Sequence, residues 1–153
     1  MTQHFDQPPQ GGAELDALLQ RSGVDFVRTE DRFQFRFSSG GCSWQVVCQC
    51  RQDWVLVYGI HPVPVQDPAR ALALCSQVNR EVVRGSLFLQ EDRFVFRTSA
   101  QLTERFEAQA RIAAALEYNA AVLSHWWERL AGEAQGLTQT FESESRLAGG
   151  LEI

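Results

Sequence analysis

The segment LCSQVNREVVRGSLFLQEDRFVFRT, residues 74–98, decides the fold because it carries three elements in succession. Apolar residues spaced three and four apart come first, and this period predicts a helix that Gly85 ends. Two apolar runs then flank the acidic turn at residues 91–93, which indicates two antiparallel strands. The segment therefore predicts a helix followed by a hairpin.

The residues before this segment predict a first helix and three more strands. ELDALLQRSG, residues 14–23, carries leucines at helical spacing. Between residues 24 and 60 the apolar period changes to two, which predicts three antiparallel strands, with a hairpin turn at residues 52–53. A short extended segment at residues 26–28 precedes these strands.

A long helix is predicted after the hairpin, where residues 103–130 carry a nearly unbroken apolar stripe and a weaker apolar line beside it. We expect residues 13–131 to form a single α+β domain. Residues 1–12 are expected to form a disordered arm, and residues 132–153 a polar, mobile tail. The predicted order is α-βββ-α-ββ-α, an antiparallel sheet of about five strands with helices mainly on one face.

Composition narrows the possible partners and the compartment. The chain has 153 residues, 44% of them hydrophobic, which is enough for a buried core. Its net charge of −5 disfavours nucleic acid and anionic membranes as partners. The four cysteines, without an apolar signal segment or membrane span, predict a cytoplasmic protein with free thiols.

The predicted order of elements over residues 13–131 resembles the type III secretion chaperone-like fold, and within it the bacterial YbjN-like family. Residues 74–98 carry this resemblance most clearly, with Val78 and Asn79 on the helix and an acidic turn before a strand that ends in arginine. The resemblance implies a small, acidic, cytoplasmic and often dimeric protein that binds polypeptide. Secretion chaperones hold an extended client segment, and YbjN-like members are described as regulators; we favour the YbjN-like side.

The cysteines and histidines predict packing rather than chemistry. Cys42, Cys48 and Cys50 share one side of a strand with Trp44, and they lack the Cys-x2-Cys spacing of structural zinc sites. No Ser, Cys or Asp is placed by the sequence for a histidine to activate. We therefore predict no catalytic residue, no metal site and no cofactor, and hence no enzyme.

The less hydrophobic face of the sheet is the candidate binding surface. Its centre is predicted to be apolar and its rim to consist of arginine and glutamine, which suits an extended acidic or amphipathic peptide. The alternative is that a helix or a second subunit covers this face. The candidate residues are Arg36, Val47, Val55, Val57, Phe88, Val95 and Arg97.

The weaker apolar line of the long helix suggests a homodimer. Trp126 and Trp127 point about 100° apart on a helix, so one of them faces a partner or lies flat over its own subunit. The amide of Asn79 bonds backbone, ties its helix to a partner, or is simply exposed. The candidate dimer contacts are Asn79, Tyr118, Val122 and Trp126.

The functional hypothesis is a non-enzymatic protein- or peptide-binding module, either a YbjN-like regulator or a secretion-chaperone-like protein. The alternative is a binder of small molecules or single-stranded nucleic acid that uses the arginine-rimmed sheet face. Bases would have to stack on exposed aromatic side chains there. Most aromatic residues of the strands, however, occupy the alternate positions that are predicted to point into the core.

Overall fold

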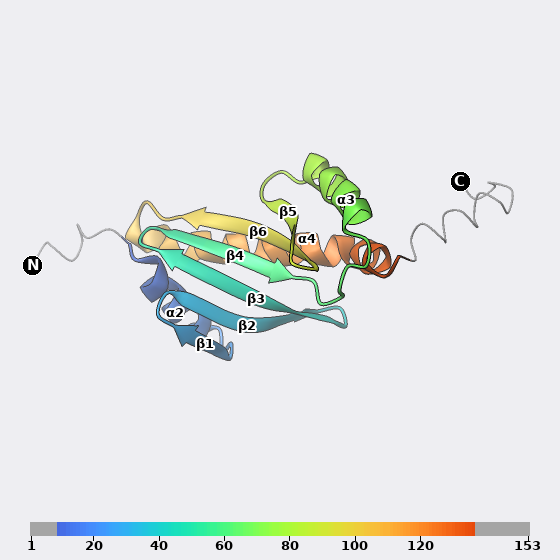
Figure 1. The fold of residues 1–153 in the computed structure, drawn as a ribbon. Coiled ribbons are helices and arrows are strands. Elements are labelled where there is room, and N and C mark those ends of the chain that lie inside the picture. Colours follow the sequence, from blue (N-terminus) through green and yellow to red (C-terminus); the bar gives the residue numbers. More distant parts are fainter. Residues whose placement is uncertain (1–8, 137–153) are drawn as a thin grey trace, which may run out of the picture.

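The computed structural model describes residues 9–136. Its elements in chain order (Figure 1) are α2 (Gly11–Arg21), β1 (Phe26–Thr29), β2 (Arg32–Ser39), β3 (Cys42–Arg51), β4 (Trp54–Ile60), α3 (Pro68–Glu81), β5 (Ser86–Gln90), β6 (Arg93–Gln101), the 3-10 turn η1 (Arg105–Glu107) and α4 (Ala108–Gln135).

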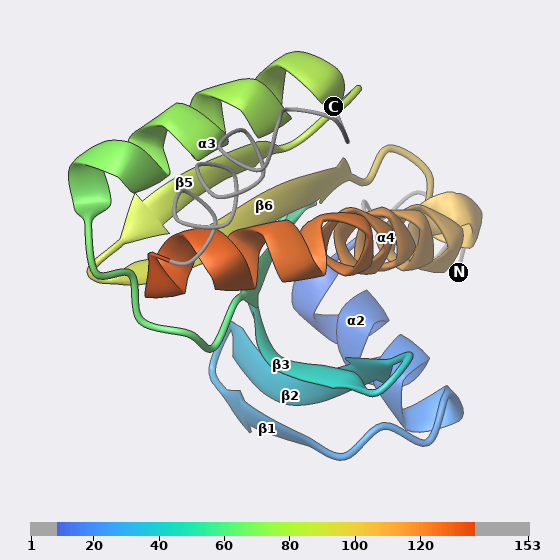
Figure 2. The ribbon, with the colours of Figure 1, turned by 90° about the vertical axis from the view of Figure 1, so that its right-hand side faces the viewer.

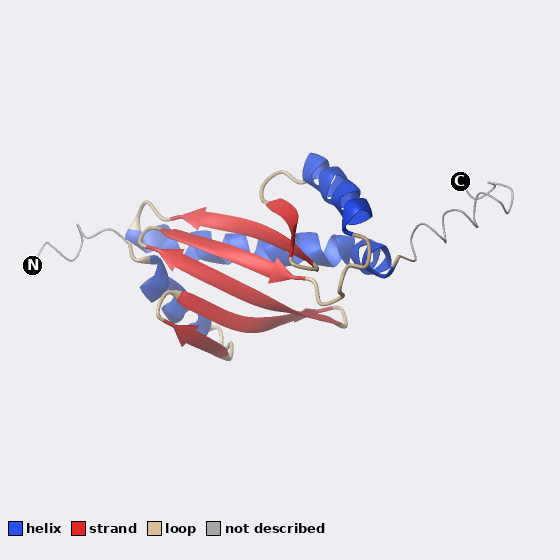
Figure 3. Ribbon diagram, viewed as in Figure 1, coloured by secondary structure: helices blue, strands red, loops and turns tan. Residues whose placement is uncertain are grey.

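The strands form one six-stranded sheet in the order β1-β2-β3-β4-β6-β5, with every neighbouring pair antiparallel (Figure 3). The predicted α+β class and antiparallel sheet are confirmed. The short segment at residues 26–28 is part of β1, which pairs with β2, so six strands form where about five were expected. Four strands therefore precede α3.

The helices lie mainly on one side of the sheet, as predicted. In Figure 1 the strands pass in front of α2 and α4, and Figure 2 shows both helices on the same side, with α3 beside β5. α4 packs chiefly on β6 and β4, and α2 packs on β3 and β4. The core lies between the sheet and these two helices.

Alternation along the strands builds this core. The largest fully buried side chains include Phe33 of β2, Trp44 of β3, and Phe94 and Phe96 of β6. Leucines of α2 and apolar residues of α4 cover them from the other side. Burial of such large apolar surfaces is the main stabilising contribution to the fold.

The amide of Asn119 fixes α4 to the middle of the sheet. Its Nδ2 donates to the carbonyls of Val57 at 3.2 Å and Phe96 at 2.9 Å. Thr98 Oγ1, which also accepts from Nδ2, donates to the carbonyl of Ala115 at 2.9 Å. A Cβ on Gly59 would lie 2.4 Å from Asn119 Oδ1, so glycine is required where the helix approaches β4.

The ends of the folded region differ from the predicted limits of 13 and 131. α2 begins at Gly11, whose N–H donates to the carbonyl of Gln52. α4 continues to Gln135, and the carbonyl of Ala134 accepts from the N–H of Gln66 at 3.0 Å. The predicted arm and tail otherwise fall on residues 1–8 and 137–153, which lie outside the described residues.

The start of the long helix also differs from the prediction. α4 begins at Ala108, after η1, so Phe106 does not belong to the buried stripe and is 83% exposed. Ile112, Ala115 and Leu123 are buried against the sheet instead. None of the helices that the structure describes is long and apolar enough to span a membrane.

Candidate functional site

The side of the sheet that faces away from α2 and α4 is the candidate site, and we call it the open face. Paired strands carry side chains of the same orientation at paired positions, so the register identifies its residues. No helix within residues 9–136 lies over it in Figures 1 and 2. Its residues include Arg32, Gln34, Arg36, Gln45, Val47, Gln49, Leu56, Tyr58, Ile60, Phe88, Arg93, Val95 and Arg97.

The assignment of Val55 and Val57 to this face was wrong. Val55 pairs with Cys50 and Val57 with Cys48, and all four side chains are buried on the helix side. Leu56, Tyr58 and Ile60 take their place on the open face. The error arose because β4, WVLVYGI, carries apolar residues at both of its alternating sets of positions. Periodicity alone therefore does not show which residues point toward the helices.

The centre of the open face is a compact apolar floor. Val47 is 8% exposed and Val95 is 2% exposed, although both point away from the helices. Their paired neighbours, Tyr58 beside Val47 and Ile60 beside Val95, are half-buried and shield them. The Tyr58 and Phe88 rings meet edge to face, with centroids 6.5 Å apart. Such interlocked side chains make a preformed surface.

Arginines surround this floor. Arg36 donates to Ser43 Oγ at 3.2 Å, and the Arg97 guanidinium lies 5.8 Å from the centre of the Phe88 ring. Arg93 pairs with Asp92 at 2.6 Å. Guanidinium groups held by neighbours in this way lose less freedom when they bind a carboxylate, and their planar fork bonds it bidentately.

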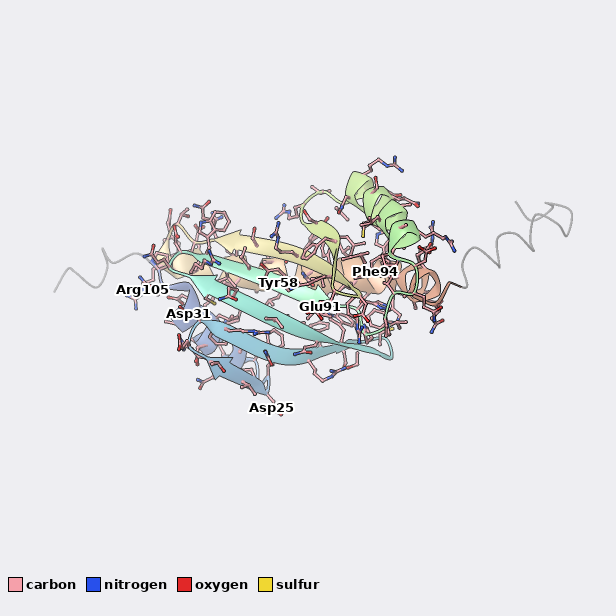
Figure 4. All side chains as sticks on the ribbon, in the orientation of Figure 1. Asp25, Asp31, Tyr58, Glu91, Phe94 and Arg105 are labelled. Carbon is pink, nitrogen blue, oxygen red and sulfur yellow. The ribbon has the colours of Figure 1, made fainter. Side chains whose placement is uncertain are left out.

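A hollow of about 440 Å³ lies within the open face. Val47, Ile60 and Val95 belong to its wall, as do Arg32 and Arg93. Figure 4 shows Tyr58 over the middle of the sheet and Glu91 at the end of the sheet where β5 turns into β6; both also line the hollow. The arrangement offers apolar contact together with hydrogen-bond donors, which are the properties of a binding surface.

Five predicted site residues therefore lie on this face: Arg36, Val47, Phe88, Val95 and Arg97. The prediction missed the aromatic centre at Tyr58. The sequence did contain a signal for it, because the two-residue turn at Gln52 and Asp53 pairs Arg51 with Trp54 and so gives Leu56 and Tyr58 the orientation of a solvent-facing arginine.

The predicted dimer contacts divide into two pairs. Asn79 bonds the main chain of Leu87, donating to its carbonyl at 3.0 Å and accepting from its N–H at 2.7 Å. The hydroxyl of Tyr118 accepts from the N–H of Val83 at 3.0 Å. The polar groups of these two side chains are thus engaged within the chain. Val122 and Trp126 are half-buried and line a shallow groove between α3 and α4.

The cysteines pack in the core, as predicted. Cys48, Cys50 and Cys75 are buried, and Cys42 is half-buried. Burial raises the pKa of Cys50 and of Cys75 to about 11, so their thiols stay protonated at neutral pH. Within residues 9–136, no group of three or more His, Cys, Asp and Glu side chains could hold a metal ion.

His61 and Trp127 form an aromatic contact at one end of the core. Their ring centres lie 4.3 Å apart, and Trp127 also contacts Trp44 at 5.2 Å. Burial lowers the pKa of His61 to about 4, with the backbone of Trp127 partly offsetting this effect. The imidazole is therefore neutral at pH 7. Trp126 and Trp127 are both half-buried against the core, and Trp127 is the one that contacts Trp44 and His61.

Comparison with solved structures identifies a neighbour in fold. The crystal structure of "YbjN, a putative transcription regulator from E. coli" matches over 74% of this chain and 85% of that chain, with a TM-score of 0.52 and 15% sequence identity. The chain has a YbjN-like fold. The resemblance seen in the sequence is thereby confirmed for the fold. No protein-family model and no curated protein matches the sequence.

Proposed function

We propose that this YbjN-like chain is a non-enzymatic binding protein whose open face holds an extended, acidic or amphipathic peptide. The observation that carries the proposal is the apolar floor of Val47, Tyr58, Ile60 and Val95, enclosed by arginines and uncovered by any helix of residues 9–136. A hollow lined by apolar side chains with a few polar groups beside them is typical of a site for another molecule.

The chemistry of the face favours an extended peptide. Side chains of an extended segment alternate, so every second one can contact the apolar floor. Acidic side chains between them would reach Arg32, Arg93 or Arg97, where charge-assisted hydrogen bonds form. The regulator role named for the YbjN structure is consistent with peptide binding, and we extend it to this chain as part of the proposal. The cytoplasmic location expected from the sequence stays a prediction.

Selection from a library of random peptides tests this function. The full chain is expected to enrich peptides that alternate apolar and acidic residues. Arg97→Glu on the open face should weaken the selected peptides at least tenfold, because a guanidinium is replaced by a like charge. Arg80→Glu, an exposed position on α3, is the matched control and should leave binding unchanged. Peptides that bind both variants equally would contradict the proposal.

A second candidate function has one specific observation in its favour. Trp54, which is 39% exposed, Tyr58 and Phe88 all have the outward orientation on their strands, close to arginines. Exposed aromatic rings beside guanidinium groups can stack nucleobases. Binding of a labelled single-stranded oligonucleotide that weakens steeply with salt would favour this function. We place it second because the net charge of −5 opposes a polyanion.

We also propose a homodimer formed through the groove between α3 and α4. Val122 and Trp126 line this groove together with Val82, and all three are half-buried. Sedimentation analysis of the full chain tests the dimer, and Trp126→Ala should shift it toward monomer. A monomer at every concentration, or a dimer that Trp126→Ala does not weaken, would contradict this part of the proposal.

A further inference from the structure

The end of α4 lies close to the rim of the open face. The carbonyl of Ala134 accepts from the N–H of Gln66 at 3.0 Å, and the neighbouring Val65 N–H donates to the carbonyl of Asp92 at 2.7 Å. Asp92 belongs to the turn between β5 and β6, next to Arg93 in the wall of the 440 Å³ hollow. Figures 1 and 2 both show the end of α4 beside this end of the sheet. The residues that follow α4 therefore start near the candidate site.

The chain that leaves α4 is long enough to reach the hollow. Gly136 ends the helix with a left-handed backbone, φ 75°, which turns the chain away from the helix axis. Five extended residues span up to about 17 Å. The route from Ala134 through residues 66, 65 and 92 to Arg93 has four steps of about 4 to 6 Å each, and the straight distance is shorter than this route. A side chain near residue 141 therefore comes within reach of the hollow.

The sequence at residues 140–147, TFESESRL, has the alternation that the open face is proposed to bind. In an extended segment, Phe141 and Leu147 share one side with the two serines between them. Glu142 and Glu144 point to the other side. The segment therefore combines apolar side chains for the floor with carboxylates for the arginines of the rim.

The charges of the segment and of the open face are complementary. Four of the residues named for this face are arginines and none of them is acidic, although the net charge of the chain is −5. Glu91 lines the hollow, but Arg32 and Arg93 belong to the same wall. Residues 137–153 carry three glutamates and one arginine, a net charge of −2. Opposite charges favour docking, and attachment to the same chain raises the effective concentration of the segment.

We propose that residues 140–147 dock in extended form on the open face of their own chain, with Phe141 on the apolar floor and Glu142 and Glu144 bonded to arginines of the rim. The inference rests on the proposed function, since it names an occupant of the same site. A client peptide must then displace this segment before it binds. A face that the segment occupies two-thirds of the time binds a client about threefold more weakly, so the segment regulates the site.

NMR of the isotope-labelled full chain without any added peptide tests the docking. Phe141→Ser should move the backbone amide signals of Val47, Tyr58 and Val95, because the segment leaves the floor. Leu151→Ser, which removes an apolar side chain outside residues 140–147, is the matched control and should leave these signals in place. Unchanged signals in Phe141→Ser, or movement confined to the groove between α3 and α4, would overturn the proposal.

Dilution distinguishes docking within one chain from docking between two copies. The difference between the native chain and Phe141→Ser should be the same at every protein concentration, because an intramolecular contact does not depend on concentration. A difference that disappears on dilution would mean that the segment binds a second copy, and it would overturn docking within the chain.

Peptide affinity separates this inference from the proposed function. A peptide selected from the library should bind Phe141→Ser at least threefold more tightly than the native chain, and Glu144→Gln should show a smaller gain. Glu152→Gln, which removes the same charge outside residues 140–147, should show none. Equal affinity of the peptide for all of these chains would overturn the inference and leave the proposed function intact. Failure of the selection itself would count against the proposed function, whereas the amide signals of Phe141→Ser decide the inference independently.

Discussion

The two faces of the sheet place alternate residues of the same strands in different surroundings. On the helix side, Phe33, Trp44 and Phe94 are fully buried, and hydrogen bonds of Asn119 hold α4 against β4 and β6. On the open face, the floor is shielded only by neighbouring side chains of the sheet itself. The contrast teaches that stability should depend mainly on the helix side and binding mainly on the open face.

The largest expected difference between the two faces comes from substitutions at adjacent residues of β4 that point to opposite faces. Gly59→Val places a side chain within 2.4 Å of Asn119 Oδ1 and of Leu123 Cδ1. We expect it to cost about 4 kcal/mol, because relieving the clash disrupts packing and the Asn119 hydrogen bonds together. Ile60→Val, on the open face, should cost about 0.5 kcal/mol. Urea unfolding measures both, and similar losses would contradict the comparison.

The pH dependence of the free energy of unfolding tests the burial of His61 at one end of the core on the helix side. His61 has a pKa of about 4 in the folded chain, against about 6.5 when unfolded. Because the unfolded chain binds the extra proton first, stability should fall as the pH drops from about 6.5 to about 4, by about 3 kcal/mol from this group.

Urea unfolding at pH 7, 5.5 and 4 measures this loss. Carboxyl groups also titrate in this range, so the quantity to compare is the difference between variants. His61→Phe should remove most of the His61 contribution, whereas His125→Gln, at an exposed position of α4, should retain it. Equal pH profiles for the native chain and His61→Phe would show that His61 is not buried as a neutral ring.

The order of the elements could be predicted from the sequence because it depends on local patterns. The change from a period near 3.6 to a period of two marks the strands, and Asp67 and Pro68 mark the start of α3, where Asp67 accepts from the N–H of Arg70. The side of β4 that faces the helices could not be read from apolarity, since both sides are apolar. The Arg51–Trp54 turn pair is the better guide to the orientation of β4.

The candidate site was predictable in part, for a physical reason. Arg36 and Arg97 stand out as charged residues that alternate with buried phenylalanines, so their orientation follows from the pattern. The burial of Val47 and Val95 depends on side chains from other strands, which only the register brings together. Asn119 was missed because a polar residue on an apolar helix face gives no sign of which carbonyls it reaches.

Asn79 provides a smaller effect that separates internal contacts from dimer contacts. Its amide bonds both main-chain groups of Leu87, so Asn79→Ala should destabilise the fold by about 2 kcal/mol by leaving them without this partner. Asn79→Asp keeps the acceptor for the Leu87 N–H and should lose less. Thermal unfolding measures both. A change in oligomeric state without a loss of stability would instead show that Asn79 contacts the partner in a dimer.

The smallest effect is expected on the rim of the open face. Arg36 is exposed and its hydrogen bond to Ser43 lies at the surface, so Arg36→Ala should change the free energy of unfolding by less than about 0.5 kcal/mol. Urea unfolding of this variant measures the change, which is compared with the losses of the Gly59 and Ile60 variants. A loss above about 2 kcal/mol would mean that the open face contributes to stability as the helix side does.

The central claim is that the open face binds an extended peptide. Its most direct test is an NMR titration of the labelled full chain with a peptide from the library selection, following the backbone amides. The account predicts that the largest shifts fall on β3, β4 and β6 around Val47, Tyr58 and Val95, with small shifts along α3. Shifts confined to the α3–α4 groove, with β3 and β4 unchanged, would contradict it.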